Sequence, residues 1–139
     1  MKKLSDTYKE LGIAFAFPIK IKDAEGNQTY YENRNDWHKR EYNSNGKVTY
    51  YENSDGWCRK GYDSDGNEIY SENNNGWYRC KYDSNGNETY YEGSKGYWHK
   101  KEYDSKGNAT YFENSDGCWY KRKCDSKGNE TYFENSNGI

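Results

Sequence analysis

A tandem repeat of 20 or 21 residues constrains the fold of this chain more than any other feature. The tryptophans recur at this spacing, at Trp37, Trp57, Trp77, Trp98 and Trp119. A tyrosine and a glycine keep the same register, at Tyr30, Tyr50, Tyr70, Tyr90, Tyr111 and Tyr132, and at Gly46, Gly66, Gly86, Gly107 and Gly128. Because several landmarks stay in step, the chain must fold as copies of one small unit.

Each unit contains two segments that are typical of tight turns, such as Asn53–Gly56 and Asp63–Gly66. Both begin with Asp or Asn and end with Gly, which predicts a type I turn closed by a left-handed glycine and a G1 bulge. About six residues rich in Tyr, Trp and Thr separate the turns, and these residue types favour strands. The chain therefore alternates short strands with reversals of direction.

This pattern predicts an all-β fold, a single elongated and twisted antiparallel β-meander of about twelve short strands built from hairpin repeats. Residues 23–139 form the repeat ribbon, and residues 1–22 form an N-terminal cap. In the cap we expect a short helix that starts at Ser5–Asp6 and ends at Gly12. Ile13, Phe15 and Phe17 alternate as a first strand.

The turn geometry also assigns side chains to the two faces of the ribbon, if every strand alternates without interruption. One face then carries Trp with Lys and Arg, and the other carries Tyr with Glu. The first face is the candidate binding surface, because Trp, Tyr and Arg are common at interface hot spots. Its predicted members are Trp37, Lys39, Tyr51, Trp57, Arg59, Trp77, Arg79, Tyr91, Trp98, Lys100, Trp119 and Lys121. Extra residues at Tyr97 and Cys118 must be absorbed by a bulge or a longer loop.

Composition narrows the choice of partners and compartment. With 21 basic and 23 acidic residues the net charge is −2, which argues against non-specific binding to nucleic acid. No apolar run is long enough to cross a membrane, and Met1–Asp6 lacks the apolar stretch of a signal peptide. The four cysteines then read as reduced thiols in a cytoplasm. These features predict a cytoplasmic protein with no membrane partner.

The candidate metal-binding and catalytic residues in the sequence do not fit these roles. Asp63–Asn67 looks like an acidic calcium loop, but the third loop position holds lysine at Lys106 and Lys127. No pair of cysteines has zinc-site spacing. His38 and His99 share a position that elsewhere holds Cys or Tyr, which is not how a catalytic base is placed. The sequence therefore predicts no catalytic residue, no metal and no cofactor, and we expect a protein that is not an enzyme.

The segment Tyr82–Asn87 resembles the YD repeat of Rhs and teneurin proteins, and Tyr62–Asn67 and Tyr103–Asn108 match it equally well. The Tyr-Glu-Asn-Ser-x-Gly element is also similar to short repeat proteins encoded by bacteriophages. A likeness to MORN repeats is weaker, because that unit is longer. The phage resemblance implies a small inhibitor of host defence, such as an anti-CRISPR, which would act in the host-cell cytoplasm.

Three functional hypotheses follow. The first is a non-enzymatic, phage-encoded inhibitor that docks its aromatic and charged face on a host protein or nucleoprotein complex. The second is a structural repeat module related to Rhs/YD surface proteins. The third is a single-stranded nucleic-acid binder, since aromatic and cationic stripes stack bases and track phosphates. Balanced charge makes free nucleic acid the less favoured partner, and exposed edge strands also allow an edge-to-edge homodimer.

Overall fold

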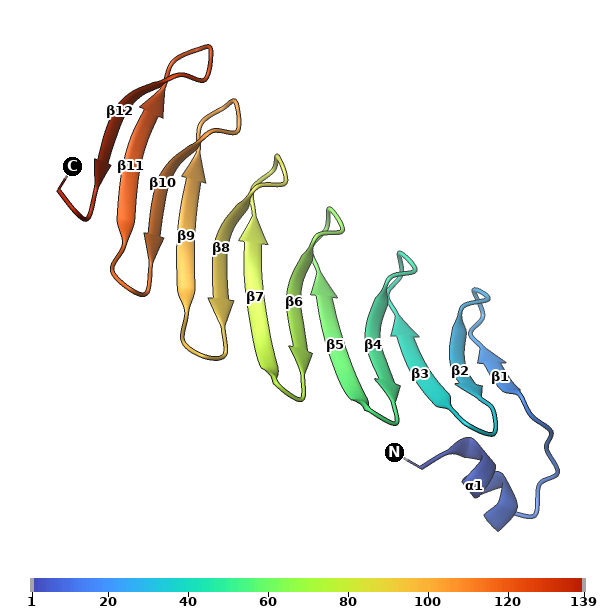
Figure 1. Cartoon of the computed structure of the whole chain (residues 1–139). Coiled ribbons are helices and arrows are strands. Elements are labelled where there is room, and N and C mark those ends of the chain that lie inside the picture. The colour runs from blue at the N-terminus through green and yellow to red at the C-terminus, as the bar shows by residue number, and fades with distance from the viewer. Residues whose placement is uncertain (1, 139) are drawn as a thin grey trace. The chain divides into compact units, whose positions relative to one another are not determined.

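The computed structural model describes residues 2–138, so Met1 and Ile139, which end the two predicted segments, lie outside it. Twelve antiparallel strands follow one another in chain order in one sheet, and one short helix precedes them (Figure 1). This confirms the predicted all-β meander. Two compact units, residues 1–60 and 61–139, are described in turn. Within residues 2–138, no helix is long and apolar enough to cross a membrane.

The first unit contains the helix and the first strands, namely α1 (Leu4–Glu10), β1 (Ile19–Lys22), β2 (Gln28–Glu32), β3 (Trp37–Tyr42), β4 (Val48–Asn53) and most of β5 (Gly56–Tyr62). The second unit contains β6 (Glu68–Asn73), β7 (Gly76–Tyr82), β8 (Glu88–Gly93), β9 (Trp98–Tyr103), β10 (Ala109–Asn114), β11 (Trp119–Cys124) and β12 (Glu130–Asn135).

The Asp-led turns have the predicted G1-bulge form. The Asp63 N–H donates to the Asn67 carbonyl at 2.9 Å, and Gly66, at φ +84°, donates to the Asp63 carbonyl at 3.1 Å. The Asp63 carboxylate accepts the N–H groups of Asp65 and Asn67. The same loop hydrogen bond from the first residue to the fifth recurs at Asp23, Asn43, Asp83, Asp104 and Asp125. Backbone donors, chiefly the N–H four residues on, hold the carboxyl pKa below its ordinary value at Asp83, Asp104 and Asp125.

The other set of turns departs from the prediction in two repeats. Asn73 pairs directly with Gly76, as Asn53 does with Gly56, so these hairpins have two-residue loops rather than a three-residue loop with a bulge. In the next repeat the inserted Tyr97 restores the longer form, because the Gly93 N–H donates to the Tyr97 carbonyl at 2.9 Å. The loop therefore absorbs the extra residue, as expected.

A further bulge follows several of the Asp- or Asn-led turns. In β7 and β8, Tyr82 pairs with Glu88, but Lys81 pairs with Tyr90, so Thr89 is left unopposed. The same shift occurs between β3 and β4, β9 and β10, and β11 and β12. One extra residue moves every later side chain to the other face of the sheet. The predicted face assignment, which assumed uninterrupted alternation, is therefore wrong.

The first unit has a small core on one face of its sheet. Ile19, Tyr30 and Trp37 are buried, and Leu4, Tyr8 and Phe15 pack against them. The predicted strand over Ile13–Phe17 is wrong, since β1 begins after it, at Ile19. This segment instead turns its Phe15 ring onto Tyr8, with centroids 5.9 Å apart, and Pro18 lacks the N–H that a strand ladder needs.

The start of α1 also differs from the prediction. Lys3 is the N-cap residue and makes no capping hydrogen bond with its side chain. Ser5 lies inside the helix, where it is buried and bonds to Glu32 instead of capping the helix. Its role is therefore to fasten the helix to the sheet.

In the second unit the hairpins are fastened to one another by a repeated pair of hydrogen bonds. The Ser94 N–H donates to the Trp77 carbonyl at 2.8 Å, and the Trp77 N–H donates to the Ser94 hydroxyl at 3.2 Å. Ser115 and Ser136 make the same two contacts with the backbones of Trp98 and Trp119. Each Gly-closed loop is thus held against the hairpin before it.

Candidate functional site

In each unit, one face of the sheet carries the tryptophans, and we call it the Trp face of that unit. Residues paired directly across antiparallel strands share a face, so the pairing of Glu92 with Trp98 and of Tyr90 with Lys100 defines its members. In the first unit these include Tyr30, Glu32, Trp37, Lys39, Tyr50, Glu52, Trp57 and Arg59. In the second they include Tyr70, Glu72, Trp77, Arg79, Tyr90, Glu92, Trp98, Lys100, Tyr111, Glu113, Trp119, Lys121, Tyr132 and Glu134.

The structure corrects the predicted surface in two ways. The tryptophans, lysines and arginines of that surface do share a face within each unit, but Tyr51 and Tyr91 lie on the opposite one, where they pair with Cys58 and His99. Conversely, the Tyr-x-Glu pairs that were expected on the opposite face lie beside the tryptophans. The bulges after the Asp- or Asn-led turns cause both errors.

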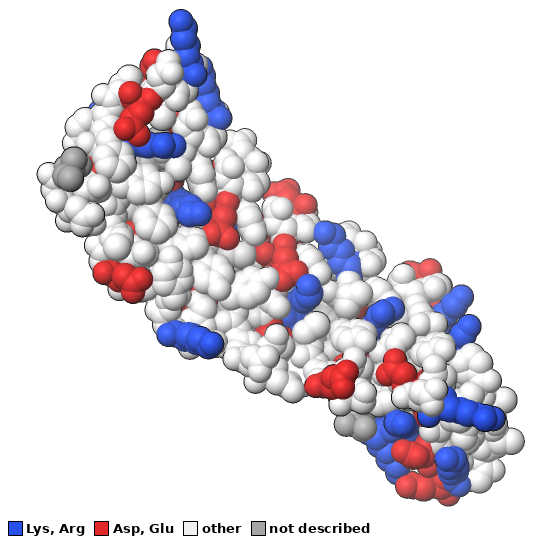
Figure 2. Space-filling model, viewed as in Figure 1, with Lys and Arg blue, Asp and Glu red and all other residues white. Residues whose placement is uncertain are grey.

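The cations of the Trp face are engaged within the sheet. The Arg79 guanidinium lies 5.3 Å from the centre of the Trp77 ring, and its Nε is 3.0 Å from the Glu92 carboxylate. Lys100 and Lys121 lie over their own tryptophans at 5.3 and 5.7 Å. Figure 2 shows acidic and basic side chains interspersed among uncharged ones. Because Arg79, Lys100 and Lys121 each pair across the strands with a glutamate, the Trp face has alternating charges rather than one cationic stripe.

A hydrogen bond from tyrosine to glutamate recurs along this face. The Tyr30 hydroxyl donates to the Glu32 carboxylate at 2.8 Å, and the Tyr111 hydroxyl donates to Glu113 at 2.9 Å. The same i to i+2 contact is made from Tyr50, Tyr70, Tyr90 and Tyr132. The recurring Tyr-x-Glu spacing was visible in the sequence, but its position beside the tryptophans depended on the register of the strands.

In the first repeat, α1 donates hydrogen bonds to the Tyr–Glu pair. The Leu4 N–H donates to the Tyr30 hydroxyl at 3.0 Å, and the Ser5 N–H donates to the Glu32 carboxylate at 3.1 Å. The Ser5 hydroxyl also donates to Glu32, while Leu4 packs on the cluster that contains Trp37. Burial opposes ionisation of Glu32, but the donors from Ser5 and Tyr30 outweigh it and lower its pKa. Burial chiefly raises the pKa of Tyr30 to about 12.

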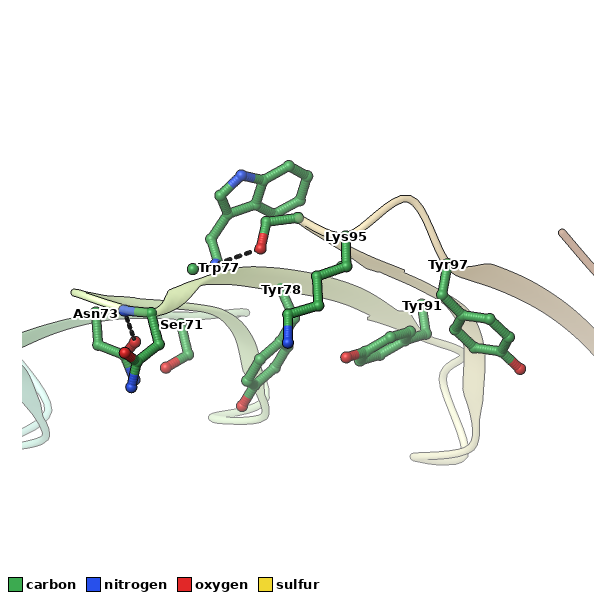
Figure 3. A pocket seen from close by; sticks show the side chains of 11 residues that line it. Ser71, Asn73, Trp77, Tyr78, Tyr91, Lys95 and Tyr97 are labelled. Atoms are coloured by element: carbon green, nitrogen blue, oxygen red, sulfur yellow. Dashed lines mark hydrogen bonds between the residues drawn. The ribbon is translucent and has the colours of Figure 1, made fainter.

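The opposite face, which we call the stacked-ring face, carries a row of aromatic rings in each unit. In the second unit the row contains Tyr78, Tyr91, His99, Phe112, Tyr120 and Phe133, with neighbouring centroids 5.3 to 6.0 Å apart. In the first unit His38 stacks between Tyr31 and Tyr51. Figure 3 shows Trp77 on one side of the strand and Tyr78, Tyr91 and Tyr97 on the other. This row was missed because the predicted register separated its members.

Hollows lie on both faces of the second unit. On the Trp face, a groove of about 520 Å³ is lined by Tyr70, Arg79, Lys81, Tyr90 and Glu92, among others. On the stacked-ring face, a groove of about 360 Å³ is lined by Ser71, Asn73, Tyr78, Tyr91, Lys95 and Tyr97, together with turn residues and with Trp77, whose ring points to the other side of the strand (Figure 3). Both grooves are shallow surfaces bordered by aromatic rings, a form suited to holding side chains of another molecule.

The remaining candidate residues are the possible metal ligands, the cysteines and the histidines. Among the residues that the structure describes, no group of three or more His, Cys, Asp and Glu side chains is arranged to hold a metal ion. Cys58, Cys80, Cys118 and Cys124 have free thiols, and the Cys80 thiol donates to the Glu68 carbonyl at 3.2 Å. His99 lies 2.6 Å from the Glu88 carboxylate, whereas His38 approaches Gln28. Each histidine therefore lies in the aromatic row of its own unit, and the two have different polar partners.

Comparison with known proteins gives a likeness in fold. No family model and no curated protein matches the sequence. A solved structure titled "Crystal Structure of TcdB2-TccC3-TEV" matches with a TM-score of 0.54 and 11% sequence identity. The match covers 83% of this chain and 7% of that chain. At this identity the likeness is one of fold alone.

Proposed function

We propose that this chain is a non-enzymatic repeat protein that binds another protein on its Trp face, in the way that α1 binds the first repeat. The contact of Ser5 and Leu4 with Glu32 and Tyr30 carries this proposal. It shows how a short segment satisfies a Tyr–Glu pair through backbone N–H groups and covers a tryptophan with an apolar side chain. Trp37 is 5% exposed beneath that segment.

Later repeats offer the same three side chains without a helix over them. Tyr111, Glu113 and Trp119 have the mutual register of Tyr30, Glu32 and Trp37. In the described part of the chain, Glu113 accepts only the Tyr111 hydroxyl, so its remaining lone pairs face solvent. A partner segment that supplies N–H or hydroxyl donors and an apolar side chain would complete this site, as α1 does in the first repeat.

The charge pattern favours protein over single-stranded nucleic acid as the partner. Lys100 pairs across the strands with Glu113, and Lys121 pairs with Glu134, so the cations of the Trp face alternate with carboxylates. A nucleic-acid strand needs consecutive cations to replace the counterions on its phosphates. A carboxylate beside each lysine weakens that attraction. We infer that the aromatic side chains serve a protein interface.

The proposal is tested first with the α1 segment, which already contacts the first repeat in this protein. A synthetic peptide of residues 3–11 is added to the full-length protein, and the indole signals of Trp98 and Trp119 are followed by NMR. We expect saturable shifts, lost in Glu113→Gln and kept in the matched control Glu130→Gln, which lies on the stacked-ring face. Shifts that are equal in both variants, or no shifts at millimolar peptide, would contradict the proposal.

Partners are then sought by capture from a bacterial lysate with the wild-type protein, the double variant Glu92→Gln/Glu113→Gln and the control Glu130→Gln. A partner of the Trp face is recovered stoichiometrically by the wild type and the control but not by the double variant. Recovery of the same proteins by all three baits would exclude the Trp face. Inhibition of a bacterial defence complex by a phage protein stays a narrower prediction, and a defence assay with the captured partner tests it.

The fold likeness favours a second candidate, a repeat module that forms part of a larger structural assembly. The TcdB2-TccC3-TEV chain contains a stretch of similar fold that amounts to 7% of its length. In that role the Trp face would pack against further protein of the same assembly. The genomic neighbourhood distinguishes the two candidates, because a structural module is expected within or beside a longer gene with the same repeat.

A further inference from the structure

The stacked-ring face of the second unit lacks one ring. Ser71 occupies the position that holds an aromatic residue in the other repeats, at Tyr31, Tyr51, Tyr91, Phe112 and Phe133. Ser71 pairs across the strands with Tyr78. Where the matching pairs have two rings, the rings stack, with centroids 5.3 Å apart for Tyr31 and His38 and 5.6 Å for Phe112 and Tyr120. Ser71 therefore leaves a space beside Tyr78 in which a ring would stack.

The polar groups around this space also lack their usual partners. In the first unit, the Asn33 and Asn53 side-chain amides donate to the hydroxyls of Tyr31 and Tyr51 at 3.3 and 3.2 Å. Asn73 has no such hydroxyl because position 71 is Ser, so within residues 2–138 its amide N–H₂ has no acceptor. The Asn73 Oδ1 accepts the Asn75 N–H at 2.8 Å, which fixes the direction of the amide.

A second departure from the repeat leaves the Tyr91 hydroxyl without its usual hydrogen-bond partner. Position 93 is Gly where the other repeats have Asn, so the Tyr91 hydroxyl loses the amide donor that Tyr31 and Tyr51 receive. In the described chain this hydroxyl makes no hydrogen bond. Tyr91 stacks on Tyr78 with centroids 5.8 Å apart. The groove therefore combines stacked phenol rings with a hydroxyl and an amide that are both available to a ligand.

The loop that contains the inserted Tyr97 builds the rest of the groove. Tyr97, which is 39% exposed, packs against Tyr91 with centroids 6.2 Å apart and forms one wall (Figure 3). Lys95 reaches over the groove from the loop and makes no ion pair in the part of the chain that the structure describes. It is the one charged side chain among the lining residues. The Tyr78 hydroxyl is fixed by donation to Glu68, so its ring is a stationary platform.

We propose that this groove binds a tyrosine side chain of an acidic peptide, the phenol ring taking the place of the ring that Ser71 lacks. The ring stacks on Tyr78, its hydroxyl accepts the Asn73 amide N–H₂ as Tyr31 and Tyr51 do in their own repeats, and a neighbouring carboxylate meets Lys95. One lysine, with Glu68 beside Tyr78, suits a peptide carboxylate better than the row of phosphates of a nucleic acid. The site lies on the face opposite the Trp face and is independent of the function proposed above.

The first probe is p-cresol, the side chain of tyrosine as a free molecule, added to the full-length protein. We expect NMR shifts confined to Asn73, Tyr78 and Tyr91 and a dissociation constant of about 1–10 mM, as suits a ligand of few atoms. Toluene, which lacks the hydroxyl, should bind several-fold more weakly. Equal binding of the two, or shifts that spread over both faces, would overturn the proposal.

Two variants locate the site. Ser71→Tyr supplies the missing ring from the chain itself, so we expect loss of p-cresol binding and a Tm higher by about 2–5 °C. Ser84→Tyr, the same change in an exposed turn, is the control that keeps binding. Asn73→Asp retains the oxygen that accepts the Asn75 N–H but removes the amide donor, and it should weaken p-cresol several-fold. Unchanged p-cresol binding in Ser71→Tyr or in Asn73→Asp would refute the site.

The choice of ligand is tested with three further probes. The tripeptide Glu-Tyr-Glu, blocked at both ends, should bind at least five-fold more tightly than Lys-Tyr-Lys, and Lys95→Gln should remove most of that difference. Lys106→Gln, in an exposed turn, is the matched control. Adenosine monophosphate offers a ring and a phosphate, and tighter binding of this nucleotide than of Glu-Tyr-Glu would replace the peptide with a nucleic-acid ligand.

Discussion

Ser5 in α1 and Glu32 in β2 are joined by two hydrogen bonds, from the serine N–H to one carboxylate oxygen at 3.1 Å and from its hydroxyl to the other. Both side chains are almost fully buried, with 3% and 1% of their surface exposed. A buried carboxylate is stable only when donors satisfy it, and here the donors come from the helix and from Tyr30. The helix is therefore attached by a specific polar contact as well as by its apolar side chains.

Replacing Ser5 by Ala should destabilise the protein because one oxygen of a buried carboxylate loses its donor. The expected loss is about 1–3 kcal/mol in the free energy of unfolding, measured by urea denaturation. Ser84→Ala, in an exposed turn, is the control and should change stability by less than about 0.5 kcal/mol. Equal effects of the two substitutions would show that the contact between Ser5 and Glu32 contributes nothing.

The Glu32 carboxylate also makes the stability of the protein depend on pH in the acidic range. Burial tends to raise the pKa of Glu32, but the hydrogen bonds from Ser5 and Tyr30 lower it below the ordinary value of 4.5. A pKa that is lower in the folded state gives stability that is present above the unfolded pKa and is lost as the pH falls through the folded pKa. We therefore expect the Tm to drop below pH 4.5 more steeply in the wild type than in Glu32→Gln. The turn aspartates titrate in both proteins, so parallel curves would exclude Glu32 as a source.

The repeat made the fold predictable, because turn chemistry acts locally and each copy repeats the same evidence. Asp63 and Gly66 suffice to indicate a G1-bulge hairpin, and the structure has one there. The cap was harder to predict. The alternation of Ile13, Phe15 and Phe17 is typical of a strand, but Phe15 gains more by packing on Tyr8 than by joining a ladder that Pro18 interrupts.

The candidate surface was predictable only in part, because the side of a sheet on which a residue lies depends on every bulge before it. The spacing of Trp77 and Arg79 within one strand placed them together correctly. The relation of Tyr91 to Trp77 crosses a turn and a bulge at Thr89, and the threonine that recurs at this position in other repeats is equally typical of an ordinary strand. The Ser71 gap was visible as the only small residue in an aromatic column, but its meaning required the partner Tyr78.

Arg79 should stabilise the sheet through Trp77 and Glu92. Its guanidinium is exposed, so the cation–π contact and the ion pair together contribute about 0.5–1 kcal/mol. Arg79→Gln should lower the free energy of unfolding by that amount in low salt, and the difference from wild type should shrink in 0.5 M NaCl because salt screens the ion pair. The measurement is urea denaturation followed by tryptophan fluorescence. A difference that is unchanged by salt would assign the effect to packing of the side chain alone.

Gly76 closes a turn and lies beside the Trp77–Ser94 hydrogen bond that joins two hairpins. We therefore expect its substitution to lower the free energy of unfolding more than most substitutions do. The residue has φ +144°, and a Cβ there would lie 2.3 Å from the Ser94 hydroxyl that accepts the Trp77 N–H. In Gly76→Ala the serine must rotate away, which breaks that hydrogen bond while the backbone stays strained, so we expect a loss of about 2–3 kcal/mol. Gly93→Ala is the matched control, since its Cβ meets Tyr91 at an ordinary 3.5 Å. Faster hydrogen exchange at the Trp77 and Ser94 amides in Gly76→Ala alone would confirm the mechanism, and equal stability of the two variants would disprove it.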